Sequence, residues 1–141
     1  MEEIKKKVAI IDDNISFVDV LGRFLAMKNF EVISAFDGTE GMKAVSRVMP
    51  DIILLDIMMP GMSGYEVCEK LKKVDKTKNI PIIFLTVRSR PEDIKKGYEL
   101  GAAFYITKPF NYPELIEGID KVLKEGGKPI KDILMGFLFN L

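Results

Sequence analysis

The fold is decided by a run of four apolar residues that ends in a carboxylate, Ile52-Ile53-Leu54-Leu55-Asp56. With Asp51 before it, this run predicts a strand over residues 51–55. Because every position is apolar rather than every second one, the strand should be covered on both faces, as the strands of parallel sheets are. Asp56 would then stand at the carboxyl end of a central, buried strand.

Three further apolar runs end in polar residues in the same way. They are Val8-Ala9-Ile10-Ile11 before Asp12-Asp13, Ile82-Ile83-Phe84-Leu85 before Thr86, and Phe104-Tyr105-Ile106-Thr107 before Lys108-Pro109. Segments with helical periodicity separate the runs, so strand and helix alternate five times, which predicts an α/β domain with a parallel sheet. The carboxyl ends of parallel strands meet at one sheet edge, where open α/β folds bind ligands, so the polar residues should converge there.

The same periodicity places the other elements. The first strand is expected over 7–11, a second over 31–35, the fourth from about 81, and helices over 15–28, 39–48, 64–74, 91–100 and from Asn111 to about Glu125. Three pairs form N-terminal capping patterns for these helices: Ser63 with Glu66, Ser89 with Glu92, and Asn111 with Glu114. Gly101 is expected to end the fourth helix in a left-handed turn.

Gly126-Gly127 marks a break that predicts a domain over 1–126 and an extension over 127–141. The extension has apolar residues at positions 130, 133, 134, 137, 138 and 141, the spacing of an amphipathic helix. Its apolar face could dock on its own domain, pair with a second copy, or begin a linker to an output domain. Docking, or a homodimer through residues 128–141, is favoured because the face would otherwise be exposed.

Composition excludes several classes of function. Lys+Arg and Asp+Glu are equal at 21 each among 141 residues, so no basic field favours direct binding of nucleic acid. The absence of histidine excludes the common zinc sites and a phosphohistidine carrier, and the single cysteine, Cys68, excludes an internal disulfide. The start of the chain does not resemble a signal peptide, and no run reaches the ~20 apolar residues of a membrane span, so we expect a cytoplasmic protein with no membrane partner.

Three carboxylates at one sheet edge predict a hard divalent cation. Asp12, Asp13 and Asp56 would repel one another if all were ionised at close range, and a few oxygen ligands with retained waters are how Mg²⁺ is usually held. One carboxylate could then attack phosphorus and form an acyl phosphate. Lys108 would supply a charge partner and Thr86 a hydrogen-bond donor to phosphoryl oxygens, so the residues predict Mg²⁺-dependent phosphoryl chemistry.

This set of residues resembles the receiver domain of two-component response regulators over about residues 6–125. The resemblance also rests on Met59-Pro60-Gly61-Met62-Ser63-Gly64, Gly101-Ala102, Tyr105 and Lys108-Pro109-Phe110. It implies a doubly wound, flavodoxin-like sheet of five parallel strands in the order 2-1-3-4-5, to which this chain would add a C-terminal helix. It also implies a sensor histidine kinase or phosphotransfer protein as phosphodonor, and an unknown downstream protein reached by protein–protein contact.

The resemblance implies distinct roles for the acids. Asp56 would accept the phosphoryl group from a phosphohistidine. Asp13 and Asp56 would ligate Mg²⁺ directly with the main-chain carbonyl of Met58, while Asp12 would act mainly through water. Lys108 would pair with the phosphoryl group, and its bond to the following proline is expected to be cis, a state that is affordable only before proline.

The resemblance also implies a switch. Thr86 would move toward the phosphoryl oxygen and draw Tyr105 inward, which would reshape the face formed by the fourth helix, fifth strand and fifth helix. Val87 stands where the family usually has alanine or glycine. Its branched side chain either crowds the site, in which case we expect slow self-dephosphorylation, or merely packs against its neighbours. Met58 and Arg88 occupy positions that influence access of the hydrolysing water in the family.

Other functions fit less well. A phosphatase of the haloacid dehalogenase type, which also forms an aspartyl phosphate, would need a second acid where Asn14 and Ile15 stand. A flavodoxin-like flavin binder would need a hydroxyl- and glycine-rich loop where Asp12-Asp13 would repel a phosphate. The chain could also be the N-terminal receiver of a longer regulator. We expect a signalling receiver that is no enzyme beyond self-phosphorylation and slow self-dephosphorylation.

Overall fold

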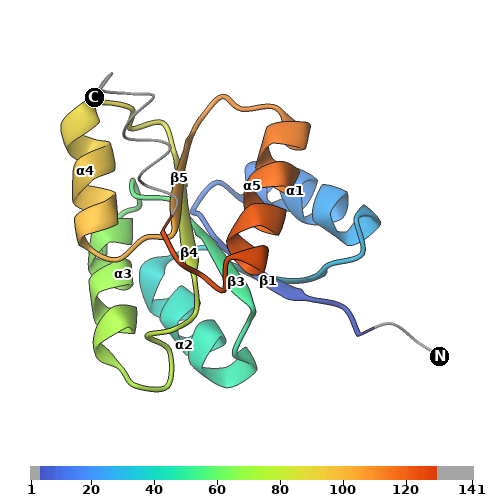
Figure 1. Cartoon of the computed structure of the whole chain (residues 1–141), viewed down its shortest axis with the longest axis horizontal. Helices are drawn as coiled ribbons and strands as arrows, with labels where there is room; N and C mark the ends of the chain where they lie inside the picture. The colour runs from blue at the N-terminus through green and yellow to red at the C-terminus, as the bar shows by residue number, and fades with distance from the viewer. Residues whose placement is uncertain (1–3, 130–141) are drawn as a thin grey trace.

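A computed structural model describes residues 4–129 of the chain, and Figure 1 shows a central sheet with helices on both of its faces. The strands are β1 Lys7–Ile11, β2 Glu31–Ala35, β3 Ile52–Leu55, β4 Ile82–Thr86 and β5 Phe104–Thr107. All neighbouring strands are parallel, and their order is β2-β1-β3-β4-β5. The expected flavodoxin-like α/β fold of order 2-1-3-4-5 is therefore confirmed.

Five helices connect the strands. They are α1 Ile15–Met27, α2 Gly38–Val48, α3 Gly64–Lys73, α4 Pro91–Glu99 and α5 Tyr112–Lys124. In Figure 1, α1 and α5 lie together on one side of the sheet, and α2, α3 and α4 lie on the other. Periodicity placed the ends of these elements to within about a residue, because helical segments alternate regularly with short, mainly apolar strands.

The central strand β3 contributes to both hydrophobic cores. Ile52 and Leu54 pack in the cluster that includes residues of α1 and α5, whereas Ile53 and Leu55 pack in the cluster with α2, α3 and α4. All four side chains are buried, and full burial of one such side chain contributes roughly 1.5–3 kcal/mol. The unbroken apolar run is thus explained by a strand that is covered on both faces.

Two of the three expected helix caps are confirmed. Ser63 Oγ accepts a hydrogen bond from the main-chain N–H of Glu66 at 3.3 Å, and Asn111 Oδ1 accepts one from Glu114 at 2.8 Å. These side chains satisfy N–H groups that a helix start leaves without a partner in the helix. Gly101 follows α4 with a φ of +106°, so the expected left-handed turn is also confirmed.

The capping pattern of Ser89 with Glu92 was a wrong prediction. The residue before α4 is Arg90, which makes no side-chain capping hydrogen bond. Pro91 explains the difference, because its fixed φ and its lack of an N–H group suit the first helical position. The helix therefore begins at Pro91, and Ser89 lies one residue too early to cap it.

The extension expected over 127–141 lies almost entirely outside the described residues. Gly126 and Gly127 both have positive φ values, +66° and +84°, as a break after α5 requires. The expected amphipathic helix, its apolar stripe and the homodimer through it concern residues that the structure does not describe. Within residues 4–129, no helix is long and apolar enough to cross a membrane.

Candidate functional site

The expected polar residues meet at the carboxyl edge of the sheet. One carboxylate oxygen from each of Asp12, Asp13 and Asp56 lies within 4.8 Å of the other two. Lys108 Nζ lies 2.6 Å from Asp12 Oδ2 and 3.9 Å from Asp56 Oδ2. Thr86 ends β4 beside them and is buried. The convergence expected from the strand ends is therefore found.

Main-chain hydrogen bonds between strands fix the acids at this edge. The N–H of Asp12 donates to the Ala35 carbonyl at 3.1 Å, and the N–H of Asp56 donates to the Ile11 carbonyl at 3.0 Å. These bonds continue the pairing of β1 with β2 and with β3, so the acids stand where the strand order reverses. Asp12 and Asp56 are thus held by the sheet, and Asp13 follows in the bend after β1.

Lys108 reaches the same edge of the sheet from the end of β5, which pairs with β4. Its N–H donates to the Thr86 carbonyl at 2.7 Å, which continues the pairing of β4 with β5. The bond from Lys108 to Pro109 is cis, as expected. The ammonium group thereby reaches Asp56, two strands away in the sheet, and Asp12, three strands away.

The three acids differ in exposure. Asp12 is 3% exposed and Asp56 is 8% exposed, whereas Asp13 is exposed. The inner acids also accept local main-chain hydrogen bonds, Asp12 from Asn14 at 2.9 Å and Asp56 from Met58 at 3.3 Å. A cation held by these oxygens could keep water molecules on the open side, next to Asp13. The donor set therefore fits a hard divalent cation.

Electrostatics favour the same interpretation. Burial raises the pKa of Asp56 above its ordinary value of 3.8; the Lys108 ammonium opposes this rise, and the nearby Asp12 carboxylate adds to it. A buried carboxylate beside a second acid is costly to ionise. A bound cation would remove that cost and would keep Asp56 ionised, as a nucleophile must be.

The expected switch residues lie around the main chain of Arg88. The Arg88 N–H donates to Thr86 Oγ1 at 3.4 Å, and the Tyr105 hydroxyl donates to the Arg88 carbonyl at 2.8 Å. The Tyr105 side chain is only 3% exposed, so this structure has the inward ring that the resemblance associates with a phosphorylated site. The movement of Thr86 and Tyr105 stays a prediction.

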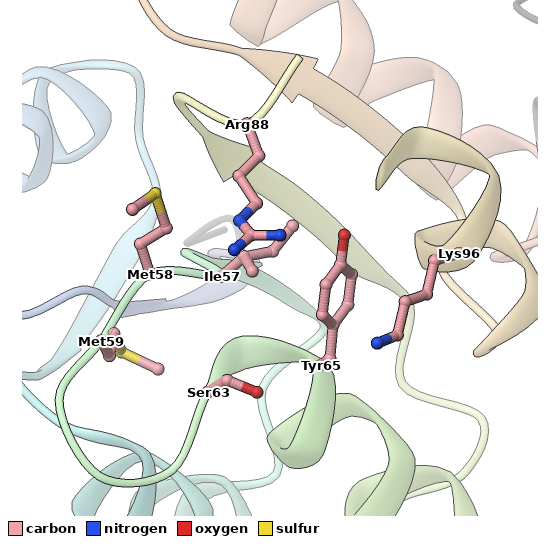
Figure 2. A pocket seen from close by; sticks show the side chains of 7 residues that line it. All are labelled: Ile57, Met58, Met59, Ser63, Tyr65, Arg88 and Lys96. Carbon is pink, nitrogen blue, oxygen red and sulfur yellow. The ribbon is translucent and has the colours of Figure 1, made fainter. Parts of the chain in front are cut away.

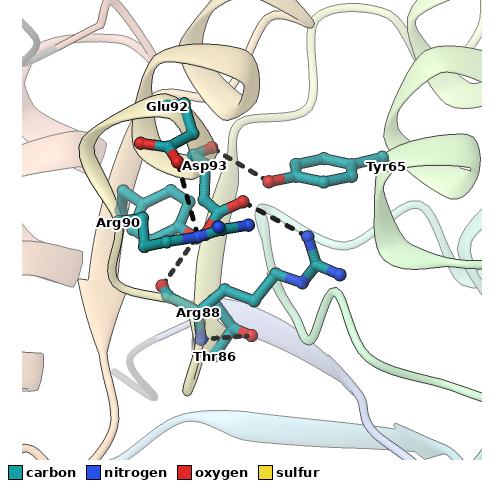
Figure 3. Close-up of polar contacts among 7 residues, drawn as sticks. Tyr65, Thr86, Arg88, Arg90, Glu92 and Asp93 are labelled. Carbon is teal, nitrogen blue, oxygen red and sulfur yellow. Dashed lines mark hydrogen bonds and ion pairs between the residues drawn. The ribbon is translucent and has the colours of Figure 1, made fainter.

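Sequence reasoning missed the side chains that tie this loop to α4 and α3. Arg88 Nη1 lies 3.2 Å from Asp93 Oδ1, and Arg90 Nε lies 3.4 Å from Asp93 Oδ2 (Figure 3). The Tyr65 hydroxyl donates to the Asp93 carbonyl at 2.9 Å. An acid in the first turn of a helix is explained equally well by the helix dipole. Nothing in the sequence therefore distinguished Asp93 as a partner of Arg88.

Hollows adjoin the site on two sides. One of about 520 Å³ lies between the loop after β3 and the helix α4, and Figure 2 shows the Arg88 side chain pointing into it. It is lined by Ile57, Met58, Met59, Ser63, Tyr65, Arg88 and Lys96. A second hollow of about 330 Å³ is lined by Phe17, Val87, Lys108, Pro109, Phe110 and Tyr112. Met58 thus lines one of these hollows and Val87 lines the other.

The sequence of residues 8–120 matches the family described as response regulator receiver domain. The chain belongs to this family. The family is not a classical enzyme family. Family membership confirms the resemblance drawn from the acids, the Met59-to-Gly64 segment and Lys108. The acidic group of Asp12, Asp13 and Asp56 is accordingly the acidic pocket of a receiver domain.

Relatives of known name agree with this assignment. The receiver domain is 40% identical to the "Probable transcriptional regulator ycf27" of Guillardia theta over 126 residues, 89% of this chain and 48% of that protein. It is 38% identical to the sensory transduction protein RegX3 of Mycobacterium bovis over 131 residues, 93% of this chain and 56% of that protein. This chain thus spans about half the length of the curated relatives that it matches.

A solved structure has the same fold. The chemotaxis protein CheY4 of Vibrio cholerae superimposes on this receiver domain with a TM-score of 0.80 at 31% sequence identity. The similarity covers 84% of this chain and 99% of that one. The whole of CheY4 therefore corresponds to the receiver part of this chain.

Proposed function

We propose that this receiver domain is a phosphorylation-switched signalling module that accepts a phosphoryl group on Asp56. The observation that supports it most is the close group of Asp12, Asp13 and Asp56 beside the Lys108 ammonium, in a chain of the receiver family. Family membership also supports a histidine kinase, or a phosphotransfer protein, as the phosphodonor. The phosphoryl group would thus come from a phosphohistidine.

Asp56 is the best acceptor among the three acids. Asp12 Oδ2 is already paired with Lys108 at 2.6 Å and its Oδ1 accepts from Asn14, which leaves it little freedom to attack. Asp56 Oδ2 lies 3.9 Å from Lys108, close enough for the ammonium to neutralise a phosphoryl group that is added there. Asp13 is exposed and lacks the enclosed position that would bring Lys108 and Thr86 to the phosphoryl oxygens.

The proposed transfer is a displacement at phosphorus. A carboxylate oxygen of Asp56 forms a bond to phosphorus while the phosphorus–nitrogen bond of the phosphohistidine breaks, and its electron pair returns to the imidazole. Lys108 balances the negative charge of the phosphoryl oxygens, and the Thr86 hydroxyl donates a hydrogen bond to one of them. The product is an acyl phosphate at the carboxyl edge of the sheet.

The proposed cofactor is Mg²⁺, for which this site has suitable donors. Asp13 and Asp56 would hold the ion together with the main-chain carbonyl of Met58, and Asp12 would act through water. When bound, the ion supplies positive charge to the phosphoryl oxygens. The raised pKa of Asp56 supports this assignment, because burial makes its ionised form costly without a compensating charge.

The proposed output is a change on the face of α4, β5 and α5 that a downstream protein reads. Thr86, Arg88 and Tyr105 are joined by hydrogen bonds through the Arg88 main chain, and Arg88 is paired with Asp93 of α4. A movement of Thr86 toward the phosphoryl group would therefore disturb the start of α4 directly. In energetic terms, the loop after β4 and the start of α4 would have two states, and the charge of the phosphoryl group would favour one of them.

A matched pair of variants tests the acceptor. The protein is incubated with Mg²⁺ and acetyl phosphate, and its intact mass is measured. We expect one phosphoryl group on the wild type and on Asp19→Asn, whose carboxylate lies exposed on α1, and none on Asp56→Asn. Equal modification of Asp56→Asn and wild type would contradict the proposal.

Control of transcription is a second candidate output, because a matched relative is named a transcriptional regulator. In this form the receiver domain would act on a DNA-binding segment or partner rather than bind DNA itself, in keeping with its equal numbers of basic and acidic residues. Transcript profiles of host cells that carry Asp56→Asn should then differ from those of wild-type cells. Identical profiles under conditions that phosphorylate the wild type would rule it out.

A further inference from the structure

An aromatic ring lies against the ammonium group of the functional site. Lys108 Nζ is 4.0 Å from the centroid of the Phe17 ring, over its face. Phe17 lies near the start of α1 and is half-buried, and the Lys108 side chain is 17% exposed. The face of an aromatic ring is electron-rich, and it attracts a cation more strongly when water is largely excluded.

The Phe17 ring is itself held in place by other rings. The Phe110 ring meets it edge-on, with centroids 6.2 Å apart and planes at 90°. The ring centroids of Phe110 and Tyr112 lie 5.7 Å apart, and those of Tyr112 and Phe24 lie 4.3 Å apart. We call these four rings, Phe17, Phe110, Tyr112 and Phe24, the aromatic row. Because it joins α1 to the segment after β5, the aromatic row fixes the Phe17 ring relative to Lys108.

The Lys108 ammonium thus has three attractive neighbours, two carboxylates and one aromatic ring. Its ammonium lies 2.6 Å from Asp12, 3.9 Å from Asp56 and 4.0 Å from the Phe17 ring centroid. A lysine side chain is flexible, and the two carboxylates restrain it from the sheet edge only. The ring restrains the ammonium from the side of α1.

We propose that Phe17 is a positioning residue that holds the Lys108 ammonium where it meets a phosphoryl group on Asp56. This inference rests on the function proposed above and extends it to a residue outside the acidic group. By sequence, Phe17 is only one apolar position of an amphipathic helix. Its ring would act through the electron density of its face, whereas a packing role would depend only on its size and apolar character.

Fluorinated phenylalanines separate these two roles, because fluorine withdraws electron density from the ring face while changing its size little. Phenylalanine with one, two or three fluorines is placed at position 17, and the rate of Asp56 phosphorylation by acetyl phosphate is measured with Mg²⁺. We expect the logarithm of the rate constant to fall steadily, by about threefold in total. Phe17→Tyr should keep nearly the wild-type rate, and Phe17→Leu should lose at least as much as three fluorines.

The same series at Phe24 is the matched control. The Phe24 ring belongs to the aromatic row, but the ammonium over its face is that of Lys28, with Nζ 5.7 Å from the ring centroid. Fluorination there should leave the phosphorylation rate unchanged. A flat series at position 17, with normal phosphorylation of the wild type, would overturn the positioning role alone. Absence of a phosphoryl group from wild-type Asp56 would instead overturn the proposed function.

A second measurement does not need phosphorylation. The Lys108 ammonium lies over the Phe17 ring face, and ring currents shift the resonances of protons above such a face upfield. We expect the ε-methylene protons of Lys108 to be shifted upfield in the wild type and in Phe17→Tyr, and the shift to be lost in Phe17→Leu. An unshifted resonance in the wild-type protein would contradict the geometry on which the inference rests.

Discussion

Three aspartates share one site, but their surroundings give them different chemistry. Asp12 is buried and paired with Lys108, Asp13 is exposed, and Asp56 is buried with the ammonium farther away. The proposed roles agree with these differences: a water-mediated metal contact for Asp12, direct metal ligation for Asp13, and the phosphoryl acceptor for Asp56. The identity of the residue alone would assign the same role to all three.

Removal of the Asp56 charge should stabilise the metal-free protein. Because burial raises the pKa of Asp56 above 3.8, its contribution to stability is fully present below that pH and is lost as pH rises through the raised pKa. Asp56→Asn should therefore melt at a higher temperature than wild type at neutral pH, with a difference that shrinks toward pH 3.8. Thermal melts in a chelator measure this, with Asp19→Asn as the control. A difference that is constant with pH would contradict it.

Val87 should slow the loss of the phosphoryl group. Val87 is 58% exposed and lines the same hollow as Lys108. Val87→Ala should shorten the lifetime of phosphorylated Asp56 by about threefold, or roughly 0.7 kcal/mol in the barrier. Decay is followed after removal of the phosphodonor, with Val74→Ala, at the exposed end of α3, as the control. Equal lifetimes for Val87→Ala and wild type would refute the crowding.

At the scale of elements, two loops connect the site to the helices. The loop after β4 is tied to α4 by Arg88 and Asp93, and the loop after β3 runs directly from Asp56 into α3. Caps that depend on neighbouring residues, such as Ser63 and Asn111, could be read from the sequence. The Arg88–Asp93 and Phe17–Lys108 contacts could not, because they depend on how helices pack on the sheet.

The start of α3 requires glycine at position 64. A Cβ atom there would overlap the Asp56 carbonyl oxygen and come within 2.7 Å of the Ile57 Cα atom. Gly64→Ala should therefore lower the free energy of unfolding by about 3 kcal/mol. Gly22→Ala in α1 is the control, since a Cβ there makes only ordinary contacts at 3.5 Å and more, and it should raise stability by up to about 1 kcal/mol. Denaturant unfolding measures both, and a loss of under 1 kcal/mol for Gly64→Ala would contradict the close approach.

At the scale of the whole molecule, the strand order placed the site. The alternation of apolar strands and helices predicts a parallel sheet, and the resemblance adds the order that brings β1 beside β3. Once that order holds, residues 12, 56, 86 and 108 must meet, because parallel strands end at one edge. The extension expected over 127–141 follows no such rule, since the apolar stripe in its sequence could be covered by more than one partner. The output of this domain, which spans about half the length of its curated relatives, could not be predicted for the same reason.

The central claim is that Asp56 carries the phosphoryl group, and chemical mapping of the acyl phosphate tests it most directly. Borohydride reduces an aspartyl phosphate to homoserine, which peptide mass spectrometry locates in the sequence. After treatment with Mg²⁺ and acetyl phosphate, we expect homoserine at position 56 and at no other aspartate, and none when Mg²⁺ is chelated. Homoserine at position 12 or 13, with an unchanged Asp56, would contradict the account.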